Sequence, residues 1–458
     1  MTQLSNKIYF PSKYIELKEG NSYLIINFDN SKSRKFEQKE YDMFSQIKEL
    51  GNPEKRNTVA DMIDNDIEFN KFVLQLIMSG MLAMRPFKKS NPDIIESRPL
   101  SVYWGISSDC NFRCRYCYAN CGGITNSKIK SYLSVNEYRS IIDKIKDFGF
   151  VEIVFTGGEP LLNTDVFEMA NYAKEKGLSC GLLTNGSLVK NYNVEQFKIF
   201  DYVKISLDST EKEVNDQLRG RGSYNKIIDA IRMLRNNDIN VDIGTVITKY
   251  NKDNLEALIT YLHSEFDIKV HTIANHIPLG RGSNSELSCS FEEVKKCDEV
   301  ILKTKWKLSQ NGLYSIIQDF FFPNGRKVSC GMGMSEIYVN EKGDVYPCRM
   351  TYDAQYYLGN LLRENLETIL SRVKKITNDL HVDKLEGCKE CDFRYLCGGG
   401  CRMYHKSYSG SIYKNYLPIC EAYKRQLISL LYVKNKLISI DWIAFAHVKT
   451  VWLKFPVH

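Results

Sequence analysis

The sequence predicts an α/β protein in which a partial parallel barrel stands between a small N-terminal module and a cysteine-rich domain. Short β-rich runs alternate with helical patterns from residue 102 to about residue 278, as they do in parallel βα units. Seven of the 14 cysteines follow residue 325 at close spacings, a pattern that indicates metal binding. The composition, 43% hydrophobic and 26% charged, is that of an ordinary folded protein.

The length of the chain bounds the number of domains, and the sequence at its start bears on the compartment in which we expect the protein. At 458 residues the chain has room for several domains. No apolar signal core follows Met1 and no apolar run reaches membrane-spanning length, so we expect a cytoplasmic protein with no membrane partner. The net charge of +7 fits either an acidic peptide partner or a solvated surface. The predicted divisions are 1–90 for a peptide-binding module, 91–100 for a linker, 101–280 for the barrel, 281–325 for a bridging region, 326–425 for the cysteine-rich domain and 426–458 for a helix and tail.

Residues 1–90 have the pattern of a small winged-helix module. The strands are expected at Lys13–Leu17, Ser22–Phe28 and Met81–Met84, and the helices at Glu37–Leu50, Val59–Met62 and Asp66–Met78. Such a module can bind an extended peptide along an exposed edge strand. DNA is the usual alternative, but the acidic start of the third helix would repel phosphate, so we expect no nucleic-acid partner.

The barrel is predicted from six strands with helices between them. The strands are expected at Val102–Ile106, Glu152–Phe155, Cys180–Thr184, Tyr202–Leu207, Val241–Ile247 and Val270–Ile273. The helices are expected at Val135–Phe148, Asp165–Lys176, Val194–Phe200, Tyr224–Asn236 and Leu255–Glu265. This order suits a partial (β/α)6 barrel of the TIM type, in which the chemistry lies at the carboxyl ends of the strands.

Four short motifs fall at those strand ends. Cys110-x3-Cys114-x2-Cys117 follows the first strand, and three thiolates can hold three irons of a cubane while the fourth iron stays open. A structural zinc ion would need four ligands, and Cys121 could be the fourth, so this stretch alone allows either kind of site. The motifs after the next three strands are Thr156-Gly157-Gly158-Glu159-Pro160, Thr184-Asn185-Gly186 and Ser206-Leu207-Asp208.

The three cysteines, with Tyr116 before the last of them and Gly157-Gly158-Glu159-Pro160 one βα unit later, resemble the radical S-adenosylmethionine (SAM) superfamily over about residues 100–280. The resemblance implies a [4Fe-4S] cluster on Cys110, Cys114 and Cys117, with SAM chelating the open iron. The SAM contacts that it implies are Tyr116, Gly157, Gly158, Glu159, Asn185, Ser206 and Arg219. The Gly-Gly turn would let the backbone approach the methionine part, and Glu159 would accept from its ammonium. An ordinary strand-end hydroxyl at Ser206 and a surface ion pair at Arg219 are the structural alternatives.

The last seven cysteines resemble the SPASM extension of radical SAM enzymes over about residues 325–425, which implies two auxiliary [4Fe-4S] clusters. By position, the ligands would be Cys330, Cys348 and Cys401 for the first cluster and Cys388, Cys391, Cys397 and Cys420 for the second. Some members have an eighth cysteine soon after the first. This chain has none there, so we expect an open iron that can bind a substrate thiolate. Gly398-Gly399-Gly400 fits a backbone turned tightly around sulfide.

The resemblance implies an oxidoreductase that removes a hydrogen atom from an unactivated carbon, with electrons from a reductant such as flavodoxin or ferredoxin. Relatives that mature ribosomally made peptides often carry an N-terminal winged-helix module for the leader. We therefore expect a peptide maturase that installs an intramolecular thioether crosslink in a precursor peptide. The alternatives are a formylglycine-generating maturase of sulfatases, a C–C crosslinking or epimerising peptide enzyme, and a DNA-binding iron-sulfur redox sensor.

Several residues match no cluster pattern. The remaining cysteines are expected to be buried or free thiols, and they are Cys121, Cys180, Cys289 and Cys297. The histidines that flank the last strand, His271 and His276, are expected to be structural.

Overall fold

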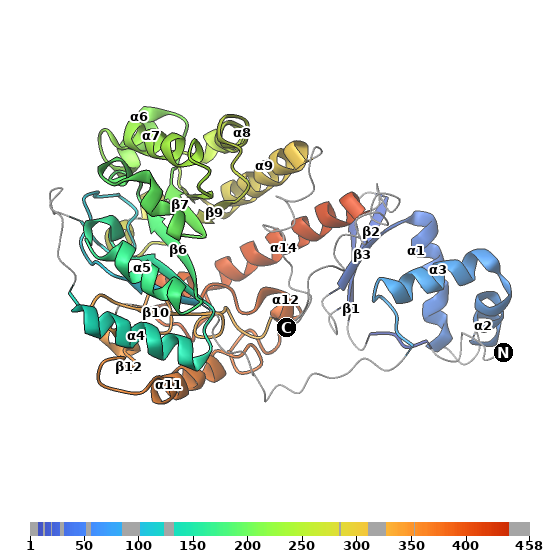
Figure 1. The fold of residues 1–458 in the computed structure, drawn as a ribbon. Coiled ribbons are helices and arrows are strands. Elements are labelled where there is room, and N and C mark those ends of the chain that lie inside the picture. The colour runs from blue at the N-terminus through green and yellow to red at the C-terminus, as the bar shows by residue number, and fades with distance from the viewer. Residues whose placement is uncertain are drawn as a thin grey trace.

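The computed structural model describes residues 8–11, 14–19, 21–27, 32–51, 56–84, 101–122, 132–283, 285–309, 327–351 and 353–438. The predicted linker at 91–100 and the tail beyond residue 438 lie outside the described residues. Figure 1 shows the N-terminal domain beside the larger body, with helix α14 (Leu417–Ile438) reaching across to it. No helix among the described residues is long and apolar enough to cross a membrane.

The N-terminal domain is a three-stranded antiparallel sheet followed by three helices. The strands, in the order β1-β2-β3, are β1 (Tyr14–Glu19), β2 (Ser22–Asn27) and β3 (Lys32–Glu37), and the helices are α1 (Gln38–Lys48), α2 (Arg56–Asn65) and α3 (Ile67–Met78). The third strand precedes the helices, whereas the sequence pattern predicted one after them. At the predicted returning strand, Ala83 forms only an isolated bridge to Tyr9.

Strand β2 is buried on both of its faces. Leu24, Ile25 and Ile26 are each 0% exposed, although successive residues of a strand point to opposite sides of a sheet. Ile25 packs in one cluster with the helices of its own domain. Leu24 and Ile26 pack with Phe393 and Leu427 of the C-terminal domain. The small sheet is therefore a middle layer between its own helices and the cysteine-rich domain.

The main sheet has nine strands in the order β12-β11-β10-β4-β5-β6-β7-β8-β9. The barrel strands run parallel to one another and are β4 (Ser101–Gly105), β5 (Glu152–Thr156), β6 (Ser179–Thr184), β7 (Tyr202–Ser206), β8 (Val241–Ile247) and β9 (His271–Asn275). Each strand lies where the alternating pattern placed it, so the predicted partial barrel is confirmed.

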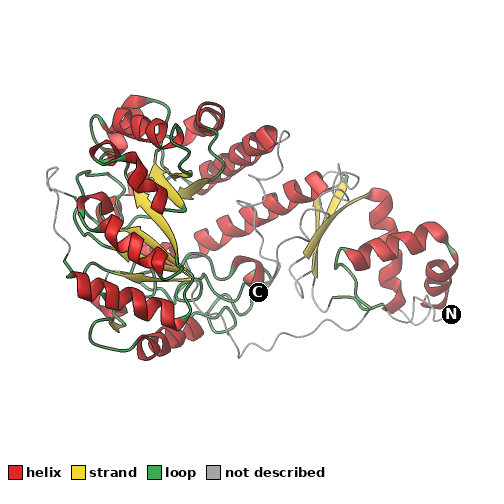
Figure 2. Ribbon diagram, in the orientation of Figure 1, coloured by secondary structure: helices red, strands yellow, loops and turns green. Residues whose placement is uncertain are grey.

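Helices cover the outer face of this sheet, as Figure 2 shows. They are α4 (Val135–Phe148), α5 (Val166–Glu175), α6 (Lys212–Arg219), α7 (Ser223–Arg235) and α8 (Leu255–Phe266). The sequence pattern did not predict α6, and the predicted helix at 194–200 is a 3-10 helix (Val194–Ile199).

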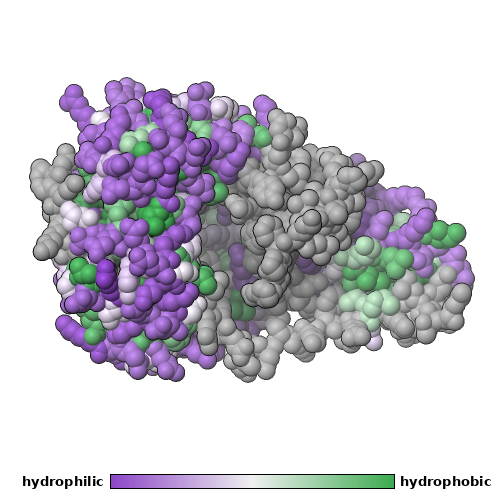
Figure 3. Space-filling view, viewed as in Figure 1, coloured by the Kyte–Doolittle hydropathy of each residue, from purple (hydrophilic) through white to green (hydrophobic). Residues whose placement is uncertain are grey.

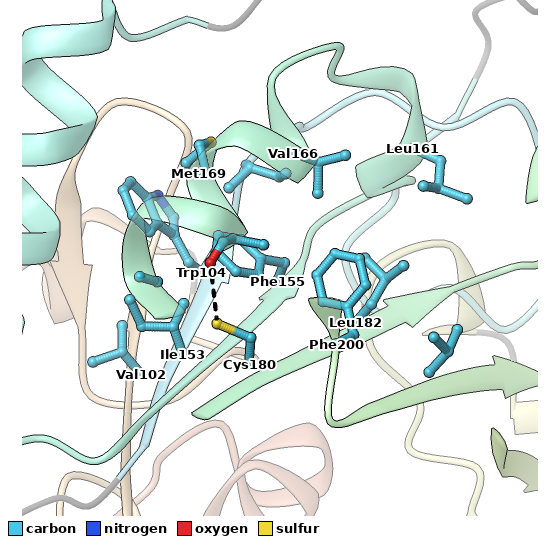
Figure 4. Packing of buried hydrophobic residues seen from close by; sticks show 14 of the residues in the cluster. Val102, Trp104, Ile153, Phe155, Leu161, Val166, Met169, Cys180, Leu182 and Phe200 are labelled. Atoms are coloured by element: carbon cyan, nitrogen blue, oxygen red, sulfur yellow. Dashed lines mark hydrogen bonds between the residues drawn. The ribbon is translucent and has the colours of Figure 1, made fainter. Parts of the chain in front are cut away.

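The core between strands and helices is built from outward-facing strand residues. Trp104, Phe155 and Leu182 come from three neighbouring strands and pack with Met169 of α5 (Figure 4). Cys180 lies in the same cluster and its thiol donates to the carbonyl of Ala170 at 3.7 Å, so the predicted buried thiol is a core residue.

The C-terminal part extends the barrel sheet. Its elements are α9 (Phe291–Ser309), β10 (Glu336–Val339), β11 (Asp344–Tyr346), β12 (Gly359–Asn360), α11 (Leu366–Asp379), α12 (Arg394–Cys397), α13 (Arg402–Ser409) and α14. Strand β10 runs parallel to β4, an arrangement that the sequence did not predict. The Trp104 indole donates to the carbonyl of Asn340 at 3.2 Å, and Ile337 and Val339 join the barrel core. Barrel and cysteine-rich domain thus share one sheet.

Candidate functional site

The first cysteine loop follows β4 and carries Cys110, Cys114 and Cys117. The Cys110 sulfur accepts from the backbone N–H of Phe112 at 3.4 Å and from the Asn185 amide at 3.7 Å. Donors of this kind tune the potential of an iron-sulfur cluster. Burial raises the pKa of Cys110 to about 12 and that of Cys114 to about 11, so metal binding must displace their protons.

Cys121 lies beside Cys117, although its spacing left it outside the predicted ligand set. A hydrogen bond from Cys121 lowers the pKa of Cys117 to about 6. Arg281, which follows the last barrel strand, fixes this end of the loop. Its guanidinium donates to the carbonyl of Cys114 at 2.8 Å and to that of Cys121 at 2.6 Å. The first and last strands of the barrel are thereby tied together at the loop.

The Gly157-Gly158 turn lies directly against the start of the cysteine loop. The backbone N–H of Gly158 donates to Ser107 at 2.7 Å, and that of Glu159 donates to Asp109 at 2.8 Å. A Cβ on Gly157, which has φ 137°, would stand 2.2 Å from the Ser107 carbonyl oxygen. A Cβ on Gly158 would stand 2.1 Å from that of Asp109. The two glycines therefore allow backbone contact between the turn and the loop, besides the predicted approach of SAM.

Glu159 is fully buried and accepts hydrogen bonds from the chain itself. The donors are the Thr184 hydroxyl at 2.6 Å and the backbone N–H groups of Asn185 at 2.8 Å and Leu161 at 3.1 Å. Burial raises the pKa of Glu159 to about 7, while the three hydrogen bonds oppose that shift. These contacts join the carboxyl ends of β5 and β6. A contact between Glu159 and the SAM ammonium stays a prediction.

Tyr116, Asp208 and Arg219 form a buried network next to the loop. The Tyr116 hydroxyl donates to Asp208. The Arg219 guanidinium donates to Asp208 at 3.1 Å, and its carbon lies 5.5 Å from the Tyr116 ring centroid. Asp208 is 0% exposed and Arg219 is 4% exposed, so this ion pair is buried and does not belong to the surface. Asp208 thus orients two of the predicted SAM contacts.

Polar side chains line the inner face of the barrel sheet. They alternate along the strands with the core residues that face the helices. Glu152 accepts from the Tyr202 hydroxyl at 3.2 Å, and the Lys204 ammonium donates to Thr272 at 3.2 Å. We call this set the inner surface, and its residues are Ser101, Tyr103, Glu152, Tyr202, Lys204, Ser206, Asp242 and Thr272. Ser206 is therefore placed on the inner surface at the end of β7.

Four cysteines of the C-terminal domain come together as the second predicted auxiliary set. Cys388, Cys391 and Cys420 lie near Cys397, and burial is the main cause that raises the pKa of Cys397 to about 12. The Asn415 amide donates to the Cys388 sulfur at 3.2 Å. We call these four residues the second set.

The turn after α12 requires glycine at three successive positions. Gly398, Gly399 and Gly400 have φ values of 66°, 81° and 65°, a left-handed backbone that other residues rarely adopt in succession. A Cβ on Gly398 would also stand 2.7 Å from the Ser329 carbonyl oxygen. The backbone turns tightly beside Cys397, as the glycine run predicted.

Cys330, Cys348 and Cys401 form the first set. Cys401 lies near Cys330, and Cys348 lies near Cys401. Burial is the main cause that raises the pKa of Cys348 to about 12. The seven cysteines thus lie in two groups, and the assignment of each group to one cluster stays a prediction from the resemblance.

Arg402 is 0% exposed and lies close to cysteines of both sets. Its guanidinium donates to the carbonyls of Ile412, Gly399 at 2.8 Å and Lys414 at 3.0 Å, and to the side chain of Asn415 at 2.8 Å. Burial lowers the pKa of Arg402, and the neighbouring thiolates counter that shift. One cation therefore supports the loop after α13 and offsets negative charge at both sets.

The donor sets fit iron-sulfur clusters. Cys110 and Cys388 are buried and their sulfurs accept N–H donors, and glycines turn the backbone tightly beside Cys397. A structural zinc site would gather four ligands around one ion. Within the described ranges, no three His, Cys, Asp or Glu side chains are placed to hold a single metal ion.

Sequence patterns missed three polar residues of these sites. Asp208, Arg281 and Arg402 each act through partners that are distant in sequence or belong to the backbone. Asp208 stands in the strand-end motif Ser206-Leu207-Asp208, which was the one signal that pointed to it. Arg281 between Gly280 and Gly282, and Arg402 directly after Cys401, carried no comparable pattern.

Two protein-family models match the chain. The radical SAM superfamily model matches residues 104–262, and the SPASM model, an iron-sulfur cluster-binding domain, matches residues 330–392. Both matches fall where the cysteine motifs predicted them. Cys397, Cys401 and Cys420 lie beyond the second match.

Curated relatives are about one quarter identical to the chain. An AdoMet-dependent heme synthase from Methanosarcina barkeri is 25% identical over 327 residues, which are 66% of this chain and 91% of the relative. The mycofactocin maturase MftC from Mycolicibacterium smegmatis is 25% identical over 326 residues, which are 68% of this chain and 80% of the relative.

Solved structures share the fold. Native anSMEcpe with bound AdoMet has a TM-score of 0.60 at 20% identity and covers 74% of this chain and 99% of its own. SuiB from Streptococcus suis bound to the precursor peptide SuiA has a TM-score of 0.56 at 16% identity and covers 91% of this chain and 98% of its own.

Proposed function

This chain is an enzyme that joins a radical SAM domain to a SPASM iron-sulfur domain, and we propose that it installs a thioether crosslink in a ribosomally made precursor peptide. Its cofactors are SAM and [4Fe-4S] clusters, one at the radical SAM site and auxiliary ones in the SPASM domain. When bound, they supply a 5′-deoxyadenosyl radical that removes a hydrogen atom from an unactivated carbon. The protein must hold that carbon in place and exclude water and stray hydrogen donors.

In this proposal the cysteine loop binds the cluster, and the carboxyl ends of the strands supply the contacts to SAM. Cys110, Cys114 and Cys117 hold the SAM-binding cluster, and Asp208 keeps Tyr116 and Arg219 in position. The remaining proposed SAM contacts are Gly157, Gly158, Glu159, Asn185 and Ser206. The inner surface, which these strand ends border, binds the segment of peptide that reacts.

The N-terminal domain offers a surface suited to a leader peptide. Strand β3 is an edge strand, so an extended peptide can pair with it. Helix α3 lies beside it, since Arg34 of β3 donates to Gln75 of α3 at 3.3 Å. Ile67, Leu74 and Met78 of α3 are exposed and, at spacings of seven and four residues, share one face of the helix. Figure 3 shows apolar surface over this domain. We call these three residues the α3 stripe.

The relatives support a peptide substrate. SuiB, which was solved with its precursor peptide, covers 91% of this chain, whereas anSMEcpe covers 74%. The larger share supports a counterpart of the N-terminal domain in SuiB. The curated relative MftC is also a maturase by name.

The observation that carries the thioether assignment is the three-cysteine first set at the edge of the inner surface. Strand β10, which leads to this set, pairs directly with β4, and its residue Glu336 lies opposite Ser101. A fourth iron without a cysteine ligand would be reached from the inner surface. A peptide thiolate bound there would stand near the carbon from which the radical removes hydrogen, as formation of a C–S bond requires.

The similarity to a heme synthase favours haem formation as a second candidate. The relative covers 66% of this chain, and a tetrapyrrole would need no leader. Haem formation would not require the exposed α3 stripe beside an edge strand, so this surface favours the peptide substrate. The assay for thioether formation therefore includes a peptide-free arm with a haem precursor.

The function is tested by anaerobic incubation of the reduced, cluster-loaded enzyme and SAM with the cysteine-containing precursor peptide encoded beside its gene. We expect loss of two hydrogen atoms per crosslink and a cysteine that no longer reacts with an alkylating reagent. Loss of two hydrogens with a free cysteine would assign C–C crosslinking, and an unchanged mass with inverted residues would assign epimerisation. Conversion of the cysteine to an aldehyde would assign formylglycine formation, and haem production in the peptide-free arm would assign the second candidate.

Replacing Leu74 of the α3 stripe with aspartate should weaken leader binding at least about tenfold, because a charge would enter an apolar contact. Fluorescence anisotropy of a labelled leader peptide measures this affinity. Cleavage of SAM without peptide should not change. The matched control is Val135→Asp on α4, where an apolar side chain of similar exposure lies outside the N-terminal domain. Equal affinities of the two variants would contradict the leader assignment.

A further inference from the structure

The first set lacks a fourth cysteine but has a carboxylate next to it. One carboxylate oxygen of Glu336 lies 4.0 Å from the sulfur of Cys348. Within the described part of the chain, no other hydrogen-bond contact joins a cysteine sulfur to a carboxylate. Glu336 stands six residues after Cys330, in the segment between the first two cysteines of the set.

The hairpin of β10 and β11 makes this proximity a property of the backbone. The two strands pair antiparallel, with Tyr338 opposite Tyr346 and Val339 opposite Val345. Strand β11 ends at Tyr346, and Cys348 follows two residues later in the bend beyond it. If the register continued past the strand end, residue 348 would lie level with Glu336, and the 4.0 Å contact between the two side chains agrees with this placement.

The surroundings of Glu336 suit an anionic ligand. The half-buried Arg349 has its guanidinium close enough to Glu336 for the two charges to act on each other. The Arg349 guanidinium carbon also stands 4.9 Å from the Tyr103 ring centroid, which holds it at the inner surface. Glu336 is partly exposed toward that surface, so its carboxylate can reach either the first set or the space in front of it.

We propose that Glu336 supplies the fourth ligand of the first auxiliary cluster through a carboxylate oxygen. An oxygen ligand is harder than the thiolates on the other irons and is the more readily exchanged in a sulfur-rich site. The sequence led us to expect an iron with no protein ligand. In this proposal Glu336 occupies that position until a softer ligand, such as a thiolate, replaces it.

This inference deepens the proposed function and rests on it in one respect, the identity of the incoming ligand. Glu336 would hold the iron through an oxygen until a peptide thiol took its place, and the released carboxylate would accept the proton of that thiol. The exchange would replace one iron–oxygen bond by one iron–sulfur bond and would need neither an oxidant nor a reductant.

The test compares Mössbauer spectra of the full-length, anaerobically reconstituted wild type with those of Glu336→Gln and Glu336→Cys. The proteins are oxidised and saturated with SAM, which occupies the open iron of the other site. β-Mercaptoethanol is the thiol probe. We expect one oxygen-ligated auxiliary iron in the wild type and only thiolate-ligated auxiliary iron in the cysteine variant, which should not bind the probe. The glutamine variant should bind the probe at least about tenfold more tightly than the wild type.

The matched control is Glu152→Gln. Glu152 lies on the same inner surface and accepts from Ser101 at 2.6 Å and Tyr202 at 3.2 Å, with no hydrogen-bond contact to a cysteine. Its variant should have the wild-type spectrum and probe affinity. Identical spectra and affinities for wild type and Glu336→Gln, or a change as large in Glu152→Gln, would overturn the proposal. These measurements contain no peptide, so failure of the thioether assay would leave the ligand assignment intact and remove only the exchange step.

Discussion

Replacing Cys114 with alanine should abolish SAM cleavage while the auxiliary clusters remain. Cys114 is the middle one of the three proposed ligands, and its sulfur lies 3.9 Å from the carbonyl of Arg219, which belongs to the buried network with Tyr116 and Asp208. We expect formation of 5′-deoxyadenosine to fall at least about 1,000-fold, because no protein group can replace the chemistry of the cluster. Iron content should fall by about one third, since one of three expected clusters is lost. Anaerobic product analysis and iron determination measure both quantities.

The discriminating comparison is Cys121→Ser. Cys121 lies beside Cys117 and is the one cysteine that could extend the ligand set from three to four. If three cysteines hold the cluster, the serine variant keeps its iron and cleaves SAM. Loss of cleavage and of one third of the iron in this variant as well would mean that the ligand set predicted from the spacing is wrong.

Replacing Arg402 with methionine should destabilise the SPASM domain by about 3–5 kcal/mol. The change leaves four acceptors without their donor, of which the carbonyls of Ile412 and Gly399 are buried. Each buried acceptor without a donor costs about 1–3 kcal/mol, and the two part-buried acceptors cost less because water can reach them. The loss of a buried cation close to both cysteine sets should also make both auxiliary clusters harder to reduce. Anaerobic urea denaturation measures the free energy of unfolding, and a redox titration monitored by electron paramagnetic resonance measures the potentials.

Arg402→Lys separates the two effects. Lysine keeps the charge but cannot reproduce a guanidinium that donates to Gly399, Lys414 and Asn415 together. The reduction potentials should therefore stay close to those of the wild type, while most of the stability is lost. A lysine variant with wild-type stability would show that the charge, and not the hydrogen-bond pattern, is what the loop requires.

Periodicity predicted the barrel because its strands and helices are apolar on regular positions. The helix α4 begins and ends at the residues that the pattern predicted, with Ser134 and Glu137 forming a capping box at its start. Strand β3 was missed because Phe36 is its one buried side chain and its other residues are polar. It exists through backbone pairing with β2. The pairing of β10 with β4 joins segments more than 200 residues apart, and no local pattern encodes such a contact.

In the candidate site, too, some residues could be predicted from a local pattern and others could not. The spacing of the cysteines indicated a cluster at the loop that begins with Cys110 and an array that begins with Cys330, and the resemblance implied how the later cysteines are grouped. Residues that position other groups do not recur at a characteristic distance along the sequence, so no motif reveals them. Asp208 and Arg402 became recognisable only when the fold brought their partners together. The same holds for Glu336, whose meaning depends on the residue across the hairpin.

If the N-terminal domain binds the leader as proposed, the burial of β2 on both faces limits how leader specificity can be exchanged between enzymes of this kind. A recognition domain grafted from another enzyme would need apolar side chains that match Leu24 and Ile26 on the face toward the SPASM domain. Without them the chimera would expose Phe393 and Leu427, and an excised N-terminal domain would expose its own half of the contact and self-associate. Changing the α3 stripe, which faces away from this contact, is the engineering route that leaves the assembled enzyme intact.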